Sequence, residues 1–224
     1  MKRYLLGLLF LSSLFVCSAS VLSEKAKVYL FTCQPGQEVY AKFGHTAIYF
    51  HDEQNGIDYV FNYGIFSFEE DFLYNFVKGN TIYELGVQEY DDFVWSYNRR
   101  SIGILSQELN LTQQEKENLF FALSINAQPE NRKYLYNFFY DNCATRPRDM
   151  VENAVEGKII YPPSHEKLTY RDLVEKYVGK NTWLKFGIDL LIGAPADDEV
   201  TNRQKMFLPD FVKNDYKGAI IERN

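Results

Sequence analysis

Apolar and polar positions alternate in short runs through the first half of the chain. Runs of this kind, rich in β-branched and aromatic residues and bounded by turn residues, are typical of strands with one buried face. The pattern predicts strands over Lys27–Thr32, Thr46–Phe50, Asp58–Tyr63, Thr81–Val87 and Ile102–Leu109. Asn55 and Gly56, between the second and third runs, predict a tight hairpin turn.

Helical spacing of apolar residues takes over in the second half. Thr112 and Glu115 form the signature of a capping box, which predicts a helix that ends near Ile125. A helix is also expected from Cys143 to Val155. Pro147 is compatible with this helix, because it falls near the first turn and removes no hydrogen bond there. Further helical segments are expected over Phe68–Lys78 and parts of the tail after Tyr170. Tyr90–Tyr97 is expected to be a short helix or turn, and Lys133–Tyr140 to be extended or irregular. Together these elements predict an α+β fold.

The N-terminus has the pattern of an export signal. Lys2 and Arg3 precede an apolar stretch from Tyr4 to Val16, and small residues follow at 17–19. A helix of that stretch would span about 20 Å, less than the roughly 30 Å hydrocarbon core of a bilayer. Residues 1–19 are therefore predicted to be a signal peptide and residues 20–224 a single periplasmic domain. Cys17 leaves a lipoprotein signal open as an alternative.

Composition narrows the possible functions. The chain has 224 residues, of which 46% are hydrophobic, enough for one compact core. Its net charge is −6, and no basic cluster is longer than Asn98–Arg100. Because neutralising phosphates requires a face rich in Lys and Arg, a nucleic-acid partner is not expected.

Cys143 is the candidate nucleophile. A thiol at a helix N-terminus lies near unpaired backbone N–H groups, which lower its pKa and stabilise a developing oxyanion. Arg146 and Arg148 would act in the same direction or bind an anionic head group. Two alternatives stay open: Cys143 is a buried structural residue, or it forms a disulfide with Cys33 in the oxidising periplasm.

His45 is the candidate base, because it precedes the strand Thr46–Phe50 and can face a thiol over the sheet edge. Asn62 is the candidate third member, since its amide oxygen can fix the imidazole tautomer from the neighbouring strand. Asp141 and Asp149 are alternatives for that role. The other two histidines, His51 and His165, are assigned to an exposed turn and a loop. No histidine or cysteine pair has the spacing of metal ligands, so neither a metal nor a cofactor is expected.

Several sequence blocks resemble a known family. They are Phe31–Gly36, Phe43–Ala47, Val60–Gly64, Tyr136–Asp149 and Met206–Pro209. These blocks are similar to the Lnb N-terminal periplasmic domain, from about Lys27 to Pro209. The order of His before Cys resembles a circularly permuted papain-like fold, as in NlpC-type and lecithin:retinol acyltransferase proteins. The resemblance implies an antiparallel sheet packed against the helix that bears Cys143.

The resemblance also implies an activity, which is N-acylation of lipoproteins. Cys143 would take an acyl chain from a phospholipid as a thioester, and the free amine of a lipoprotein N-terminus would receive it, with His45 relaying protons. Asn142, Arg146 and Arg148 are then the candidates for substrate binding. A membrane surface, that of the inner membrane, is an expected partner.

Two other functions fit the same residues. A Cys–His amidase or peptidase acting on peptidoglycan or lipid-linked substrates would use the same pair, with water resolving the intermediate. A non-catalytic envelope-binding domain could retain the fold without the chemistry. The sequence alone does not distinguish between these functions.

Overall fold

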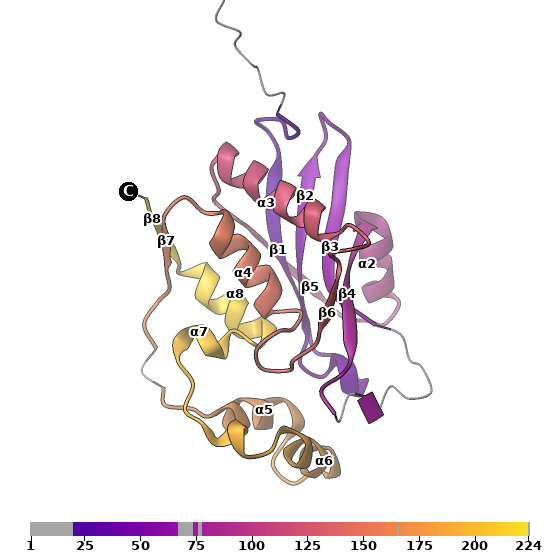
Figure 1. The fold of residues 1–224 in the computed structure, drawn as a ribbon, viewed down its shortest axis with the longest axis vertical. Coiled ribbons are helices and arrows are strands. Elements are labelled where there is room, and N and C mark those ends of the chain that lie inside the picture. Colours follow the sequence, from indigo (N-terminus) through magenta and orange to yellow (C-terminus); the bar gives the residue numbers. More distant parts are fainter. Residues whose placement is uncertain (1–19, 67–73, 76–77, 165, 224) are drawn as a thin grey trace, which may run out of the picture.

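A computed structural model describes residues 20–66, 74–75, 78–164 and 166–223 (Figure 1). Its centre is a six-stranded sheet in which every neighbouring pair is antiparallel, in the order β5–β1–β2–β3–β4–β6. The strands are β1 (Lys27–Cys33), β2 (His45–Asp52), β3 (Ile57–Ile65), β4 (Ile82–Glu89), β5 (Ile104–Glu108) and β6 (Lys133–Leu135). A two-stranded sheet of β7 (Lys158–Ile160) and β8 (Ile220–Glu222) lies apart from it.

Helices cover both faces of the large sheet. On one face, α3 (Gln113–Asn126) and α4 (Thr145–Ala154) lie across the strands, with α8 (Pro209–Lys217) beside them (Figure 1). The core on this face contains Ile48, Phe50, Phe61, Tyr63, Leu119, Leu123, Val151 and Ala154. The helix that follows Cys143 therefore packs on the sheet, as the resemblance implied.

Among the residues that the structure describes, the opposite face carries one short helix, α2 (Tyr90–Asn98). Its residues Phe93 and Tyr97 pack against Ala47 and Val60 in a second core cluster. Successive residues of a strand point to opposite faces, so β2 and β3 divide their side chains between these two clusters. Ile48 and Phe61 belong to one cluster, and Ala47 and Val60 to the other.

A helical unit closes one end of the sheet. It consists of α5 (Tyr170–Val178), α6 (Trp183–Ile192), η2 (Ala194–Asp197) and α7 (Asn202–Lys205), and Figure 1 shows α5 and α6 below the sheet. Its own core is built around Tyr170, Leu173 and Val174 with Phe207 from the segment after α7. Phe139 also belongs to this core and ties the unit to the loop that leads to Cys143.

The predicted elements agree with this architecture. All five predicted strands are present with ends that differ by up to two residues, and η1 (Val39–Ala41) is an additional short 3-10 helix. Thr112 and Glu115 form the capping box that starts α3. Lys133–Tyr140 splits into β6 and an irregular stretch. The α+β class is confirmed.

Two predictions fall on residues outside the described ranges. The signal peptide over residues 1–19 is one of them, and most of the helix expected over Phe68–Lys78 is the other. In that second segment Tyr74 and Asn75 are described, and both are helical. Within the described ranges, none of the helices is long and apolar enough to span a bilayer.

Candidate active site

His45 and Asn62 face each other from neighbouring strands. His45 opens β2, Asn62 lies in β3, and His45 Nε2 is 2.6 Å from Asn62 Oδ1. The Nδ2 of Asn62 donates to Gln88 Oε1 on β4 at 2.8 Å, which orients the amide. An amide oxygen only accepts, so Nε2 of His45 carries the proton. Nδ1 of His45 is left with the lone pair of a base.

Cys143 lies just before α4, and its neighbour Asn142 holds it there. The buried Asn142 Oδ1 accepts hydrogen bonds from the N–H groups of Ala144 at 2.7 Å and Thr145 at 2.9 Å. Its Nδ2 donates to the carbonyl oxygens of Phe138 and Phe207. Asn142 thus caps the helix N-terminus and fixes the turn that carries the thiol. This contact set is structural, and Asn142 does not line the cavity described below.

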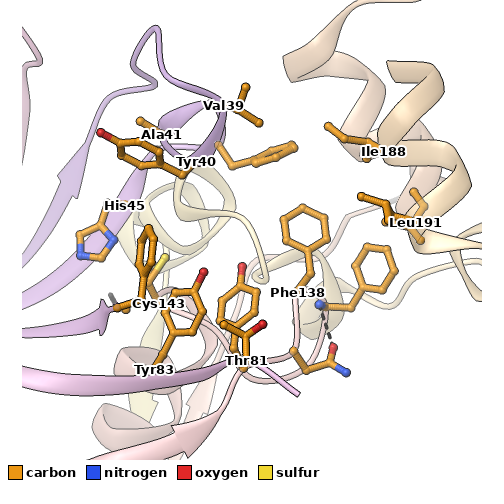
Figure 2. Close-up of a pocket in the computed structure, with 18 of the residues that line it drawn as sticks. Val39, Tyr40, Ala41, His45, Thr81, Tyr83, Phe138, Cys143, Ile188 and Leu191 are labelled. Carbon is orange, nitrogen blue, oxygen red and sulfur yellow. Dashed lines mark hydrogen bonds between the residues drawn. The ribbon is translucent and has the colours of Figure 1, made fainter. Parts of the chain in front are cut away.

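Gly64 brings the thiol and the imidazole together. Its φ of +95° lies in the region that favours glycine. A Cβ placed on it would lie 3.3 Å from Cys143 Cβ and 3.6 Å from His45 Cε1. Both atoms are therefore within van der Waals reach of one point on β3. Figure 2 shows His45 and Cys143 beside each other at one end of a pocket. A larger residue at this position would separate the two side chains or displace one of them.

Burial keeps both groups neutral. Desolvation lowers the pKa of His45 to about 4; the hydrogen bond to Asn62 opposes this shift, and the charge of Arg100 adds to it. Desolvation also raises the pKa of the Cys143 thiol to about 11, against the N–H groups of Thr46 and of Cys143 itself, which lower it. Backbone N–H groups thus lower the thiol pKa, but burial outweighs them, and the net shift is upward rather than the depression expected from the sequence. The resting pair is a thiol and a neutral imidazole.

A cavity of about 680 Å³ extends from Cys143 toward α6. Its walls come from η1 and the start of β2, the β3–β4 region, the loop before Cys143, and α6. Most lining side chains are apolar or aromatic; they include Val39, Phe43, Phe66, Tyr83, Ile102, Tyr136, Phe138, Phe139, Ile188, Leu191 and Ile192. Ile188 and Leu191 lie across the pocket from Cys143 (Figure 2). The cavity suits an apolar ligand that reaches the thiol at one end.

Arg100 is the one permanently charged side chain among the described residues that line the cavity. Its guanidinium lies over the Tyr97 ring, 4.6 Å from the centroid, and its Nε donates to the Ser96 carbonyl. No carboxylate in the described part of the chain forms an ion pair with it, in contrast to Arg146 and Arg148. Arg100 thus offers positive charge close to His45 within apolar surroundings.

Arg146 and Arg148 are engaged elsewhere. Arg146 pairs with Asp141 through two hydrogen bonds and lies 3.7 Å from the Tyr134 ring centroid. Arg148 is buried, pairs with Asp149 and donates to the Arg203 carbonyl. Neither arginine lines the cavity. Asp141 and Asp149, the alternatives for the third member, are held in these pairs. The candidate that contacts His45 is Asn62.

The remaining cysteine and histidines of residues 20–224 are Cys33, His51 and His165. Cys33 is buried at the end of β1, opposite His45 in the strand register, and burial raises its pKa to about 12. Cys33 and Cys143 are both free, so the disulfide alternative is not the state observed. His51 Nδ1 lies 2.9 Å from Asp58 Oδ1 on the neighbouring strand. His165 lies outside the described residues.

Sequence reasoning missed two features of the site. Arg100 appeared only as part of a short basic cluster, because no local pattern links the end of α2 to a thiol far along the chain. Gly64 belongs to one of the blocks that resemble the family, but its contact with Cys143 depends on how α4 packs. A positive φ at a strand glycine is not visible in the sequence.

The comparison with known families identifies the family of the chain. The sequence model of the Lnb N-terminal periplasmic domain matches residues 17–176, more than half of the chain. The chain belongs to this family of periplasmic domains. The matched range includes His45, Asn62 and Cys143 but ends before Met206–Pro209, which the resemblance had included. Among curated proteins and among solved structures, nothing matched.

Proposed function

We propose that this protein transfers acyl groups through a thioester on Cys143, with phospholipid as donor and the amine of a lipoprotein N-terminus as acceptor. One observation carries the proposal: a free thiol meets a histidine held by Asn62 at the end of a mostly apolar cavity. The arrangement has the parts of a Cys–His–Asn site, in which a base activates a nucleophile and a third group orients the base.

The first step in this mechanism forms the thioester. The thiol proton of Cys143 passes to Nδ1 of His45 as the sulfur attacks the ester carbonyl carbon. The tetrahedral intermediate collapses by breaking the bond between the carbonyl carbon and the alkoxide oxygen, and the imidazolium protonates the departing lysophospholipid. The N–H groups of Thr46 and Cys143, which point toward the sulfur, are the candidates to stabilise the oxyanion.

The second step transfers the acyl group to an amine. The amine attacks the thioester carbon, His45 accepts the proton that the nitrogen loses, and the C–S bond breaks. The thiolate then takes that proton back and restores the resting pair. Since the pKa of His45 is lowered and that of Cys143 is raised, the neutral state is recovered after each turnover.

The lining of the cavity favours an acyl chain over a sugar or a peptide as donor. Each methylene group moved from water into apolar surroundings contributes about 0.8 kcal/mol. Aromatic and aliphatic side chains form most of the walls between Cys143 and α6, so this gain is available along their length. A peptidoglycan fragment would instead require paired hydrogen-bonding groups along that path.

Arg100 supplies a candidate contact for the phosphate of the donor. A guanidinium binds phosphate oxygens through two parallel hydrogen bonds, and such bonds strengthen where water is scarce. Its position in the cavity wall and the lack of an ion-pair partner among the described residues leave it available. Arg100 takes the place that the sequence had assigned to Arg146 and Arg148.

A circularly permuted papain-like fold is part of the proposal. Two features support it: the histidine strand precedes the cysteine helix along the chain, and α4 packs on an antiparallel sheet.

The test is the mass of the protein after incubation with phosphatidylethanolamine. We expect a covalent gain of one acyl group on the peptide that contains Cys143, removable by hydroxylamine, which cleaves thioesters. Cys143→Ala should abolish the gain, whereas Cys33→Ala, which removes the other thiol of residues 20–224, should retain it. Addition of a diacylglyceryl-cysteine peptide should then produce its N-acyl form.

Three results would contradict parts of this proposal. Free fatty acid in place of the amide would indicate a hydrolase in which water resolves the thioester. Cleavage of a peptidoglycan fragment without acylation by phospholipid would indicate the amidase alternative. The absence of any adduct or product with either substrate would favour the non-catalytic binding domain.

A further inference from the structure

Helix α6 exposes apolar side chains to solvent. Trp183, Phe186 and Leu190 are spaced by three and four residues, so they form one face of the helix, and 89%, 63% and 75% of their surfaces are exposed. Leu191 is exposed beside them. No residue of this ten-residue helix is buried. Water-exposed helices of soluble domains normally present polar residues on such a face.

The charged residues of α6 point the other way. Lys185 and Asp189 pair with each other across one turn of the helix. Asp189 also pairs with Arg171 of α5, and Lys185 lies 3.5 Å from Glu175 of the same helix. These side chains are half-buried between α5 and α6. The ion pairs of α6 therefore lie toward α5, while its apolar side chains face both the protein core and the solvent.

The same helix forms part of the cavity wall. Ile188, Leu191 and Ile192 line the cavity that contains Cys143, and Figure 2 shows Ile188 and Leu191 across it from the thiol. The apolar surface thus continues from the exposed face of α6 around to the inside of the pocket. Leu191 belongs to both, because it is partly exposed and also lines the cavity.

We propose that α6 inserts its Trp183–Phe186–Leu190 face into the surface of a phospholipid bilayer. A helix that is apolar on most sides and has its charges neutralised internally is suited to the boundary between head groups and acyl chains. Tryptophan at its first turn favours that boundary. Continuity with the cavity argues for lipid as the occupant, and this step rests on the proposed function: an acyl chain leaving the bilayer along α6 would reach the pocket without crossing water.

The binding should depend on apolar contact rather than on charge. The charged residues around α6 are mutually paired, and the whole chain has a net charge of −6, so anionic lipid would not attract it. Vesicles of zwitterionic phosphatidylcholine should be sufficient, and raising the salt concentration should not release the protein.

The test uses the two tryptophans as separate reporters. In Trp95→Phe the remaining Trp183 should show a blue-shifted emission with phosphatidylcholine vesicles and quenching by lipids brominated on their acyl chains. In Trp183→Phe the remaining Trp95, which is also exposed but lies on α2, should show neither change. Equal responses from both tryptophans, or none from Trp183, would overturn the proposal.

A double substitution measures the contribution of the apolar face. Phe186→Ser with Leu190→Ser should weaken partitioning into vesicles roughly tenfold or more, because each buried side chain contributes to binding. Phe121→Ser with Ile125→Ser changes two exposed apolar residues of α3, at the opposite end of the molecule from α6 (Figure 1), and should leave partitioning unchanged. If the unsubstituted protein forms dimers but does not bind vesicles, and the α6 double variant is a monomer, then a second copy of the chain covers this face and the proposal is overturned.

Acylation by a soluble short-chain phospholipid separates this inference from the proposed function. The α6 double variant should be acylated normally by monomeric dihexanoylphosphatidylcholine but slowly by vesicles. If the unsubstituted protein is acylated by the monomeric lipid but does not bind vesicles, the docking of α6 is overturned and the acyl transfer is not. Insertion of Trp183 without acylation from either donor would overturn the acyl transfer and leave the docking in place.

Discussion

Asn62 holds the imidazole of His45 through a 2.6 Å hydrogen bond to Nε2, and Gln88 in turn holds Asn62. The network lies on three adjacent strands, so the sheet itself sets the orientation of the base. Its consequence is a fixed tautomer, in which the lone pair of Nδ1 is available to the thiol.

Replacing Asn62 should therefore slow acylation without unfolding the protein. In Asn62→Ala the imidazole loses the acceptor that selects its tautomer, and we expect the rate of adduct formation to fall by about 10²-fold, within the range of general acid–base effects. Gln88→Leu removes only the residue that orients Asn62 and should have a smaller effect. The rates are measured by quenching the reaction at intervals and analysing the protein by mass spectrometry. Equal rates for Asn62→Ala and the unsubstituted protein would show that Asn62 has no part in the mechanism.

The contact between Gly64 and Cys143 gives a second prediction. Gly64→Ala introduces a strained positive φ and a Cβ that meets both reacting side chains, so stability should fall by about 1–2 kcal/mol and acylation should be nearly lost. Gly56→Ala is the matched control, since Gly56 has a φ of +64° with nothing within 4 Å of its added Cβ. It should show a similar cost in urea unfolding with normal acylation. A rate loss in both variants would attribute the effect to general strain.

The pH dependence of thiol reactivity gives a third. Burial raises the pKa of Cys143 to about 11, so the thiolate is a minor species at neutral pH. Alkylation of Cys143 by iodoacetamide should accelerate about tenfold per pH unit up to that value. A rate that is already maximal near pH 7 would indicate a preformed thiolate–imidazolium pair instead.

The lowered pKa of His45 links stability to pH. The folded state binds the proton only near pH 4, whereas an unfolded histidine binds it near 6.5. Between these values the unfolded state holds more protons, so the free energy of unfolding should rise with pH from 4 to 6.5, by up to about 3 kcal/mol. His45→Gln should flatten this part of the curve in urea titrations. His51→Gln changes a partly exposed histidine that does not line the cavity and is the control for the substitution itself.

Arg100 gives a prediction about the donor. Arg100→Ala should raise KM for phospholipid roughly 10–100-fold, the range for hydrogen bonds to charged groups, and should leave the KM for an uncharged acyl ester nearly unchanged. Arg99→Ala is the matched control, because Arg99 lies over the Trp95 ring and does not line the cavity. Equal losses with both donors would indicate that Arg100 acts on the site rather than on the phosphate.

Much of the sheet could be predicted because alternation is a local property. Val60 and Asn62 share one face of β3, and Phe61 and Tyr63 share the other, as their spacing indicates. Val60 packs in the cluster with α2, while Phe61 and Tyr63 pack in the cluster with α3 and α4. Asn62 was chosen because its amide oxygen lies on the strand next to that of His45, and the structure brings the two residues into contact.

The roles of Asn142, Arg146 and Arg148 could not be deduced in the same way. Their closeness to Cys143 in sequence suggested contact with substrate, but the turn before α4 directs Asn142 into the protein and Arg146 onto Tyr134. The pKa of Cys143 depends on burial by several segments, which no local signal reports. The outward apolar face of α6 likewise requires knowledge of what packs against its other side.

The hydrogen bond from Asn142 to the Phe207 carbonyl has a practical implication for the family boundary. A fragment ending at residue 176, where the family match stops, would lack Phe207 and the whole of α6. The amide that anchors the cysteine turn would then lose a buried acceptor, and one wall of the pocket would be missing. An expressed fragment of this protein should therefore extend at least through Phe207, so that the Asn142 amide keeps its acceptor.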